Sequence, residues 1–110
     1  MTVIVGSKNF KVTSAIRDFI ERHVGKLHKV HHKISQVQVH LESVARKQND
    51  PLANSVTVEV EVPGKDVVVT KRDANMYTAI ANAIKIAFRD LRKRGEKKET
   101  LRLKGRRAGG

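Results

Sequence analysis

The fold of this chain is decided by the stretch MYTAIANAIKIAFRDL, residues 76–91. Its apolar residues recur at the spacing of an α-helix and form one continuous stripe, made of Met76, Ile80, Ala83, Ile84, Ala87 and Leu91. Either Asp73 or Asn75 is suited to cap the start of this helix. The helix is expected to fade near Gly95. Because only one face of it is apolar, the helix must cover another element.

The residues before this helix predict the sheet that it covers. Ser55–Val62 alternates strictly between valine and polar side chains, and Ile34–Glu42 alternates less cleanly, with Val37, Val39 and Leu41 on one side. Such alternation is typical of strands with one buried face and one face in water. Pro63-Gly64 predicts a turn into a return strand over Lys65–Thr70. The polar stretch Ser43–Asn54 between the two alternating segments is expected to be a loop.

The N-terminal part adds a strand and a second helix. Thr2–Gly6 is rich in β-branched residues, and Thr13 is a candidate N-cap for a helix from about Ser14 to about His28. The order β-α-β-β-β-α predicts an α+β domain with a four-stranded sheet and two helices on one of its faces. We expect this domain to cover residues 1–95, and residues 96–110 to form a flexible basic tail.

The charge balance points to a polyanionic partner. Lys and Arg total 23 against 11 Asp and Glu, a formal net charge of +12. From Lys71 to the end there are 13 basic and 4 acidic residues, so most of the excess lies in the last 40 residues. Nucleic acids and membrane surfaces are both polyanions, and charge alone does not choose between them. Only 4% of the residues are aromatic, which argues against recognition by stacking on unpaired bases.

A basic stripe on the last helix favours structured RNA. Lys85, Arg89, Arg92 and Lys93 fall within an arc of about 100° opposite the apolar stripe, and only Asp90 interrupts them. Solubility alone would also explain such a stripe, but unpaired like charges on one helix repel each other. If the two helices lie side by side, basic residues of the first helix and the last strand would join this patch. The candidate RNA-binding residues are therefore Arg22, Lys26, Lys29, Lys71, Arg72, Lys85, Arg89, Arg92 and Lys93.

The sequence gives little support for an enzyme or a metal site. His23, His28, His31, His32 and His40 are not accompanied by any cysteine, and few carboxylates lie near them, so no metal site is expected. There is no nucleophile elbow and no glycine-rich phosphate loop, so we expect neither catalysis, nor a cofactor, nor a small-molecule substrate. No apolar run is long enough to span a bilayer and the N-terminus does not match a secretory signal, so a cytoplasmic protein with no membrane partner is expected.

Two segments resemble a known family. They are residues 6–17, followed by Lys26-Leu27, and residues 75–80, which open a helix that runs to Arg89-Asp90-Leu91. Both resemble the ribosome hibernation promoting factor family, which includes the ribosome-associated inhibitor also called protein Y. The resemblance spans about Thr2 to Lys93. It implies a fold like that of double-stranded RNA-binding domains. It also implies a site on small-subunit rRNA between head and body, across the tRNA and mRNA sites, where translation is blocked in stationary phase or stress.

The resemblance also bears on individual residues. Lys26, Lys29, Arg89 and Lys93 match basic positions of the family pattern, whereas Asn75 replaces the usual aspartate. The chain ends in a basic sequence and lacks the dimerisation domain of long family members, so the short type is expected, a monomer when free that at least permits ribosome dimers. Two alternatives remain: a ribosome assembly factor that binds structured RNA without inhibiting translation, and a metal-dependent enzyme or sensor using the histidines. Tyr77 is expected to pack rather than to stack on a nucleotide.

Overall fold

The computed structural model describes residues 1–44 and 52–109, with side chains as far as Arg94. The elements are β1 (Thr2–Lys8), α1 (Ser14–Gly25), a short 3-10 helix η1 (Lys26–Lys29), β2 (Gln36–Ser43), β3 (Asn54–Glu61), β4 (Val67–Asp73) and α2 (Met76–Gly109). The predicted order β-α-β-β-β-α is confirmed, and the first helix only tightens into 3-10 geometry in its last turn. Part of the predicted loop over 43–54 lies outside the described residues.

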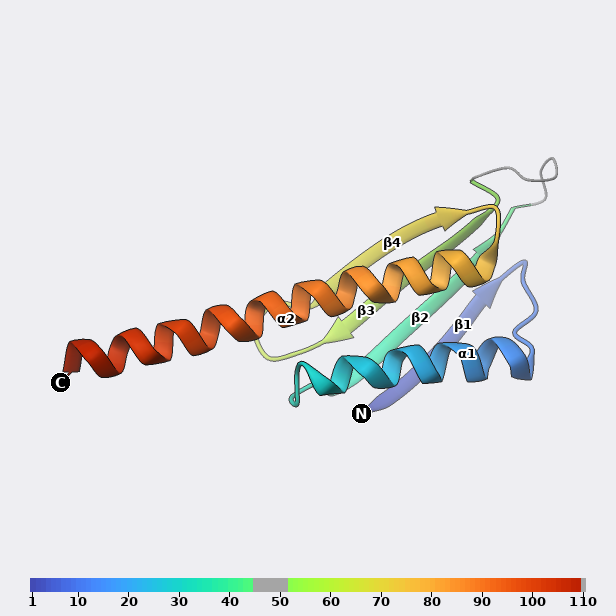
Figure 1. The fold of residues 1–110 in the computed structure, drawn as a ribbon. Coiled ribbons are helices and arrows are strands. Elements are labelled where there is room, and N and C mark those ends of the chain that lie inside the picture. Colours follow the sequence, from blue (N-terminus) through green and yellow to red (C-terminus); the bar gives the residue numbers. More distant parts are fainter. Residues whose placement is uncertain (45–51, 110) are drawn as a thin grey trace.

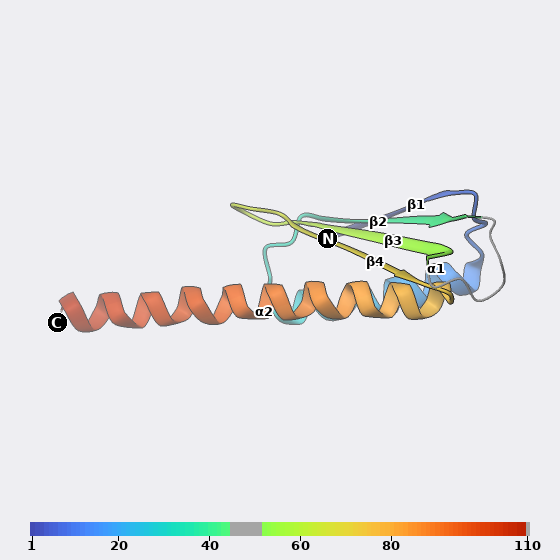
Figure 2. The same cartoon turned by 90° about the horizontal axis from the view of Figure 1, so that it is seen from above.

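The four strands form one mixed sheet in the order β1-β2-β3-β4. β1 runs parallel to β2, and the other two pairs are antiparallel. The parallel pair requires a crossover, which α1 provides, and the β3–β4 hairpin turns at Gly64, whose φ of 90° lies in the left-handed region that glycine favours. Figures 1 and 2 show both helices on the same face of the sheet, as the sequence predicts.

The core lies between this face and the two helices. Val56, Val58 and Val60 of β3 are fully buried and pair in register with buried residues of β2. From the helices, Ile20 and Ile80 meet them with no exposed surface. Each such side chain contributes roughly 1.5–3 kcal/mol when it leaves water. The apolar stripe of residues 76–91 is therefore the face that holds α2 on the sheet.

Side-chain hydrogen bonds fix where both helices begin. The Thr13 hydroxyl oxygen accepts a hydrogen bond from the backbone N–H of Ile16 at 3.2 Å, as its predicted role as N-cap requires. At the start of α2, the Asn75 side-chain oxygen accepts from the N–H of Tyr77 at 2.9 Å. Asp73 instead accepts from the N–H of Asn75 and holds the turn before the helix. Of the two predicted candidates, Asn75 is the cap.

Replacing Thr13 by alanine should lower the free energy of unfolding by about 0.5–2 kcal/mol, because the Ile16 N–H loses its acceptor. Urea denaturation followed by circular dichroism measures this change. Thr2→Ala is a matched control, since Thr2 is an exposed strand residue, and its replacement should change stability by less than about 0.5 kcal/mol. Equal losses in the two variants would show that the cap adds nothing.

The prediction that the last helix fades near Gly95 is wrong. α2 is 34 residues long and continues to Gly109, so it projects beyond the sheet (Figure 1). A glycine within a helix costs only about 1 kcal/mol, and the strong helix formers Glu, Lys, Leu and Arg dominate the residues that follow. The division into a domain over 1–95 and a flexible basic tail over 96–110 stays a prediction. Within the described chain, no helix has the length and apolar character needed to cross a membrane.

Candidate nucleic-acid interface

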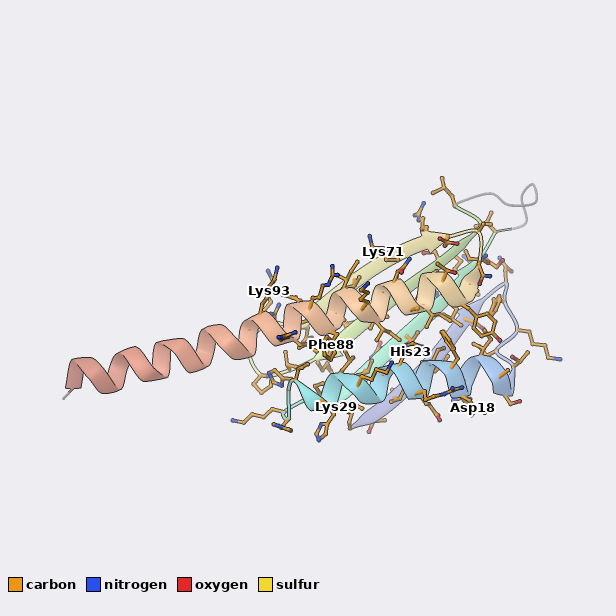
Figure 3. All side chains as sticks on the ribbon, viewed as in Figure 1. Asp18, His23, Lys29, Lys71, Phe88 and Lys93 are labelled. Atoms are coloured by element: carbon orange, nitrogen blue, oxygen red, sulfur yellow. The ribbon has the colours of Figure 1, made fainter. Side chains whose placement is uncertain are left out.

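Seven of the nine candidate residues lie on α1, η1 and α2. Because the apolar stripes of α1 and α2 face the sheet, helical spacing turns the charged positions away from it. All seven are exposed, and Figure 3 shows Lys29 on the first helical segment and Lys93 on α2. We call this set the helix-layer cations: Arg22, Lys26, Lys29, Lys85, Arg89, Arg92 and Lys93.

The two helices bring their basic residues to a common groove. α1 and α2 run side by side in Figure 1 and are in contact. Between them lies a groove of about 430 Å³, lined by Lys26 from the first helical segment and Lys85 from α2. His23, Ala81, Asn82, Ile84 and Phe88 complete its lining. The expectation that basic residues of the first helical segment join those of the last helix on one side of the molecule is therefore consistent with this arrangement.

Few carboxylates offset this charge. Asp90 pairs with Arg94 at 3.5 Å, but both side chains are substantially exposed, and exposed pairs of this kind contribute only about 0–1 kcal/mol. Lys26, Lys85 and Arg89 form no ion pair with any other described residue. Lys26 and Lys85 therefore carry positive charge that no ion pair with a described residue neutralises, which favours a polyanion as the partner of the groove.

The two candidates on β4 point to opposite faces of the sheet. Lys71 pairs in register with the buried Val56, so its side chain lies on the helix side, at the edge strand (Figure 3). Arg72 pairs with Ser55 and lines a smaller pocket of about 250 Å³ with Glu42, Val44 and Leu52 on the open face. Successive side chains of a strand alternate between faces. The expectation that Arg72 joins the helix patch is therefore wrong.

A row of ring contacts that the sequence did not reveal joins α1 to the start of α2. The Tyr77 ring meets Phe19 edge-on at 4.9 Å between centroids, and Phe19 lies 4.4 Å from the His23 ring. Tyr77 therefore packs, as predicted, although 41% of its surface remains exposed. Phe10, Phe19 and Phe88 are partly buried against the core. The contact between Phe19 and His23 could have been predicted from their four-residue spacing, since residues four apart are neighbours on a helix.

His23 is the titratable group that the groove perturbs. Partial burial lowers its pKa below the usual 6.5, and the positive charges of Lys26 and Arg22 lower the pKa further. The imidazole is therefore neutral at pH 7. Among the described residues, no three His, Asp or Glu side chains converge on a point where a metal ion could bind. The neighbouring His28 and His32 rings instead meet edge-on at 5.4 Å.

Lowering the pH should destabilise the protein through His23. Between the depressed pKa of His23 and 6.5, the unfolded chain takes up a proton on this side chain that the folded chain resists. The free energy of unfolding should therefore fall as the pH drops below about 6.5. His23→Gln should show a flatter fall in urea denaturation at pH 7.5, 6.5 and 5.5. The carboxylates contribute equally to both proteins. An identical dependence of the free energy of unfolding on pH in both would therefore show that His23 does not cause the fall.

The sequence of this chain matches a known protein family. The family model described as "Sigma 54 modulation protein / S30EA ribosomal protein" matches residues 3–99. The "Ribosome hibernation promotion factor" of Deinococcus radiodurans is 30% identical over 89 residues, which cover 81% of this chain and 46% of that protein. The "Ribosome hibernation promoting factor" of Pseudomonas putida is 28% identical over 101 residues, which cover 92% of this chain and 93% of that protein. This chain thus spans about half the length of the first relative and nearly all of the second.

Solved structures share the same fold. The N-terminal domain of Thermus thermophilus Protein Y superposes with a TM-score of 0.73 at 24% identity, over 84% of this chain and 98% of that one. A ribosomal subunit interface protein from Coxiella burnetii superposes with a TM-score of 0.69 at 15% identity, over 91% and 99%. Since the family model covers nearly the whole described domain, this chain belongs to the Sigma 54 modulation protein / S30EA ribosomal protein family.

Proposed function

We propose that this protein is a ribosome hibernation factor, which binds small-subunit rRNA in the cytoplasm and inhibits translation. The observation that carries the proposal is the set of helix-layer cations, two of which, Lys26 and Lys85, line one groove from separate helical segments. The names of the relatives support the same role, since the matched proteins of D. radiodurans and P. putida are ribosome hibernation factors.

The chemistry of this surface suits the backbone of a folded RNA. Long, exposed basic side chains on the helices reach phosphates, whereas base edges in the deep, narrow groove of duplex RNA are out of reach. Shape and the positions of phosphates would then determine where the protein binds. A cleft such as the channel for tRNA and mRNA, walled by rRNA, offers phosphates to both helices at once, and occupying it would exclude those ligands.

The opposite side of the molecule supports a one-sided mode of binding. The register places three carboxylates, Glu42, Glu59 and Glu61, on the open face of the sheet, against the cations Lys8 and Arg72. A polyanion gains little from approaching that face. We therefore orient the helices toward the rRNA and the open face of the sheet away from it.

Inhibition can be measured in a cell-free translation system. Saturating protein should suppress synthesis of a reporter at low salt, and inhibition should weaken steeply as salt rises, because counterion release drives the binding. Translation that continues unchanged under saturating protein would contradict the inhibitory role.

Sedimentation distinguishes the proposal from an assembly role. In a sucrose gradient of a stationary-phase extract, a hibernation factor should travel with complete ribosomes. An assembly factor would instead travel with immature small subunits. Recovery of the protein only with immature particles would therefore overturn the proposal, even if RNA binding were confirmed.

A further inference from the structure

We propose that the groove between α1 and α2 receives the base of a single unstacked nucleotide, whose flanking phosphates contact Lys26 and Lys85. This inference rests on the proposed function and names what one part of its surface recognises. It gives the protein a preference among RNA structures that phosphate contacts alone do not provide.

The groove has the size and lining of a site for a flat ring. Its volume of about 430 Å³ lies within the range of about 300–1,000 Å³ in which proteins hold small ligands. Ile84 forms a buried floor with 3% of its surface exposed. Phe88 and His23 are partly exposed and line the groove from opposite helices, and in Figure 3 both side chains lie between α1 and α2.

The low aromatic content argues against stacking on unpaired bases, but the fold brings two rings, His23 and Phe88, to one groove. This lining explains why a base, and not only a phosphate, fits. Bases that leave a stack are held in proteins by aromatic or planar side chains. His23 is held neutral by burial and by the nearby cations, which lower its pKa, so it offers an uncharged ring. Asn82 lines the same groove, and the amide of this exposed residue supplies both a donor and an acceptor for the edge of a base.

Charge complementarity selects RNA as the source of that base. Lys26 and Lys85 are both exposed while Ile84 is buried, so the lysines stand at the rim of an apolar groove. A nucleotide within a strand carries a phosphate on each side of its sugar, which matches a cation on each helix. A free mononucleotide offers only one such group and lacks the contacts that the remaining cations make with neighbouring phosphates.

Two RNA hairpins test the inference. They share one stem and one length, and they differ in whether a 2-aminopurine nucleotide is bulged or base-paired. Fluorescence anisotropy at fixed salt should show the bulged hairpin binding about 5- to 150-fold more tightly, the ratio that one stacked base provides. The fluorescence of the bulged 2-aminopurine should change on binding, since it reports stacking.

Variants that fill the groove keep the test specific. Ala81→Leu places bulk in the groove without removing a charge, and Asn82→Leu does so at an exposed position that the core does not use. Both should bring the affinity for the bulged hairpin down to that for the paired one. Ala15→Leu is the matched control, because Ala15 is exposed on α1 and does not line the groove. Lys85→Ala should weaken binding of the bulged hairpin more than that of the paired one, because Lys85 contacts a phosphate that flanks the inserted base.

Three results would overturn the inference. The first is equal binding of both hairpins by the unaltered protein. The second is an undiminished preference for the bulged hairpin in both groove variants. The third is displacement of the bulged hairpin by micromolar free AMP, which would make a free nucleotide the occupant. The proposed function fails separately, if the unaltered protein neither sediments with ribosomes nor inhibits translation. A protein that inhibits translation but shows no preference for the bulge would retain its function and lose only this site.

Discussion

Replacing Lys26, Lys29, Arg89 and Lys93 together by alanine should weaken ribosome binding at least about 100-fold. Each exposed cation that bonds to a phosphate contributes roughly 1.5–3 kcal/mol as a charged hydrogen bond, so the loss of even two such contacts exceeds this factor. Co-sedimentation with purified ribosomes, over a range of protein concentrations, measures the dissociation constant.

The salt dependence of ribosome binding shows whether lost phosphate contacts cause the lower affinity of this variant. The slope of log K against log salt should become shallower by about 3, since each neutralised phosphate accounts for about 0.7–0.9. The four side chains are exposed, so their replacement should alter the free energy of unfolding by only a few tenths of a kcal/mol each, within about ±0.5. Extensive unfolding of the variant would show that these side chains are structural.

A second quadruple variant controls for net charge. Lys8, Lys11, Lys65 and Arg72 are exposed and lie on the open face of the sheet or in loops. Replacing them by alanine removes the same four positive charges. This variant should bind ribosomes within a few-fold of the unaltered protein. Equal weakening in both variants would mean that overall charge, and not the helix layer, determines binding.

The spacing of apolar residues predicted most of the fold, because each helix and strand buries one face and exposes the other. Residues 76–91 bury a stripe in period 3.6 and residues 55–62 bury valines in period 2, so each pattern identifies both the element and its inward side. Thr13 predicted where α1 begins, whereas Asp73 and Asn75 both remained candidate caps for α2, and only the hydrogen bonds of the structure decide for Asn75. The end of α2 was missed because Gly95 was given more weight as a helix breaker than the helix formers after it support.

The candidate site was only partly predictable, since its geometry arises between elements. Helical spacing located the basic positions on each helix, but strand alternation sends Arg72 to the open face, away from Lys71. The groove depends on the packing of α1 against α2, which brings His23 and Phe88 together from positions 65 residues apart. No pattern of neighbouring residues predicts a contact between positions so far apart in the sequence. Neither the groove nor the lowered pKa of His23 therefore follows from the sequence alone.

Leu27 links the stability of the core to the position of the cations. It has no exposed surface and lies in η1 between Lys26 and Lys29, and its carbonyl oxygen accepts hydrogen bonds from the N–H groups of Val30 and His31 at 3.2 Å each. Because η1 also packs against α2, the Leu27 side chain anchors this end of the helix layer.

Leu27→Ala should therefore reduce both stability and binding. Loss of a buried leucine costs about 2–5 kcal/mol, a large part of the roughly 5–15 kcal/mol by which domains are stable. Urea denaturation measures the first effect, and co-sedimentation with ribosomes at a temperature where the variant stays folded measures the second. Leu52→Ala is the control, because Leu52 is 49% exposed, and it should change stability by less than about 0.5 kcal/mol. A folded Leu27→Ala protein with unchanged ribosome affinity would show that the positions of Lys26 and Lys29 do not depend on this anchor.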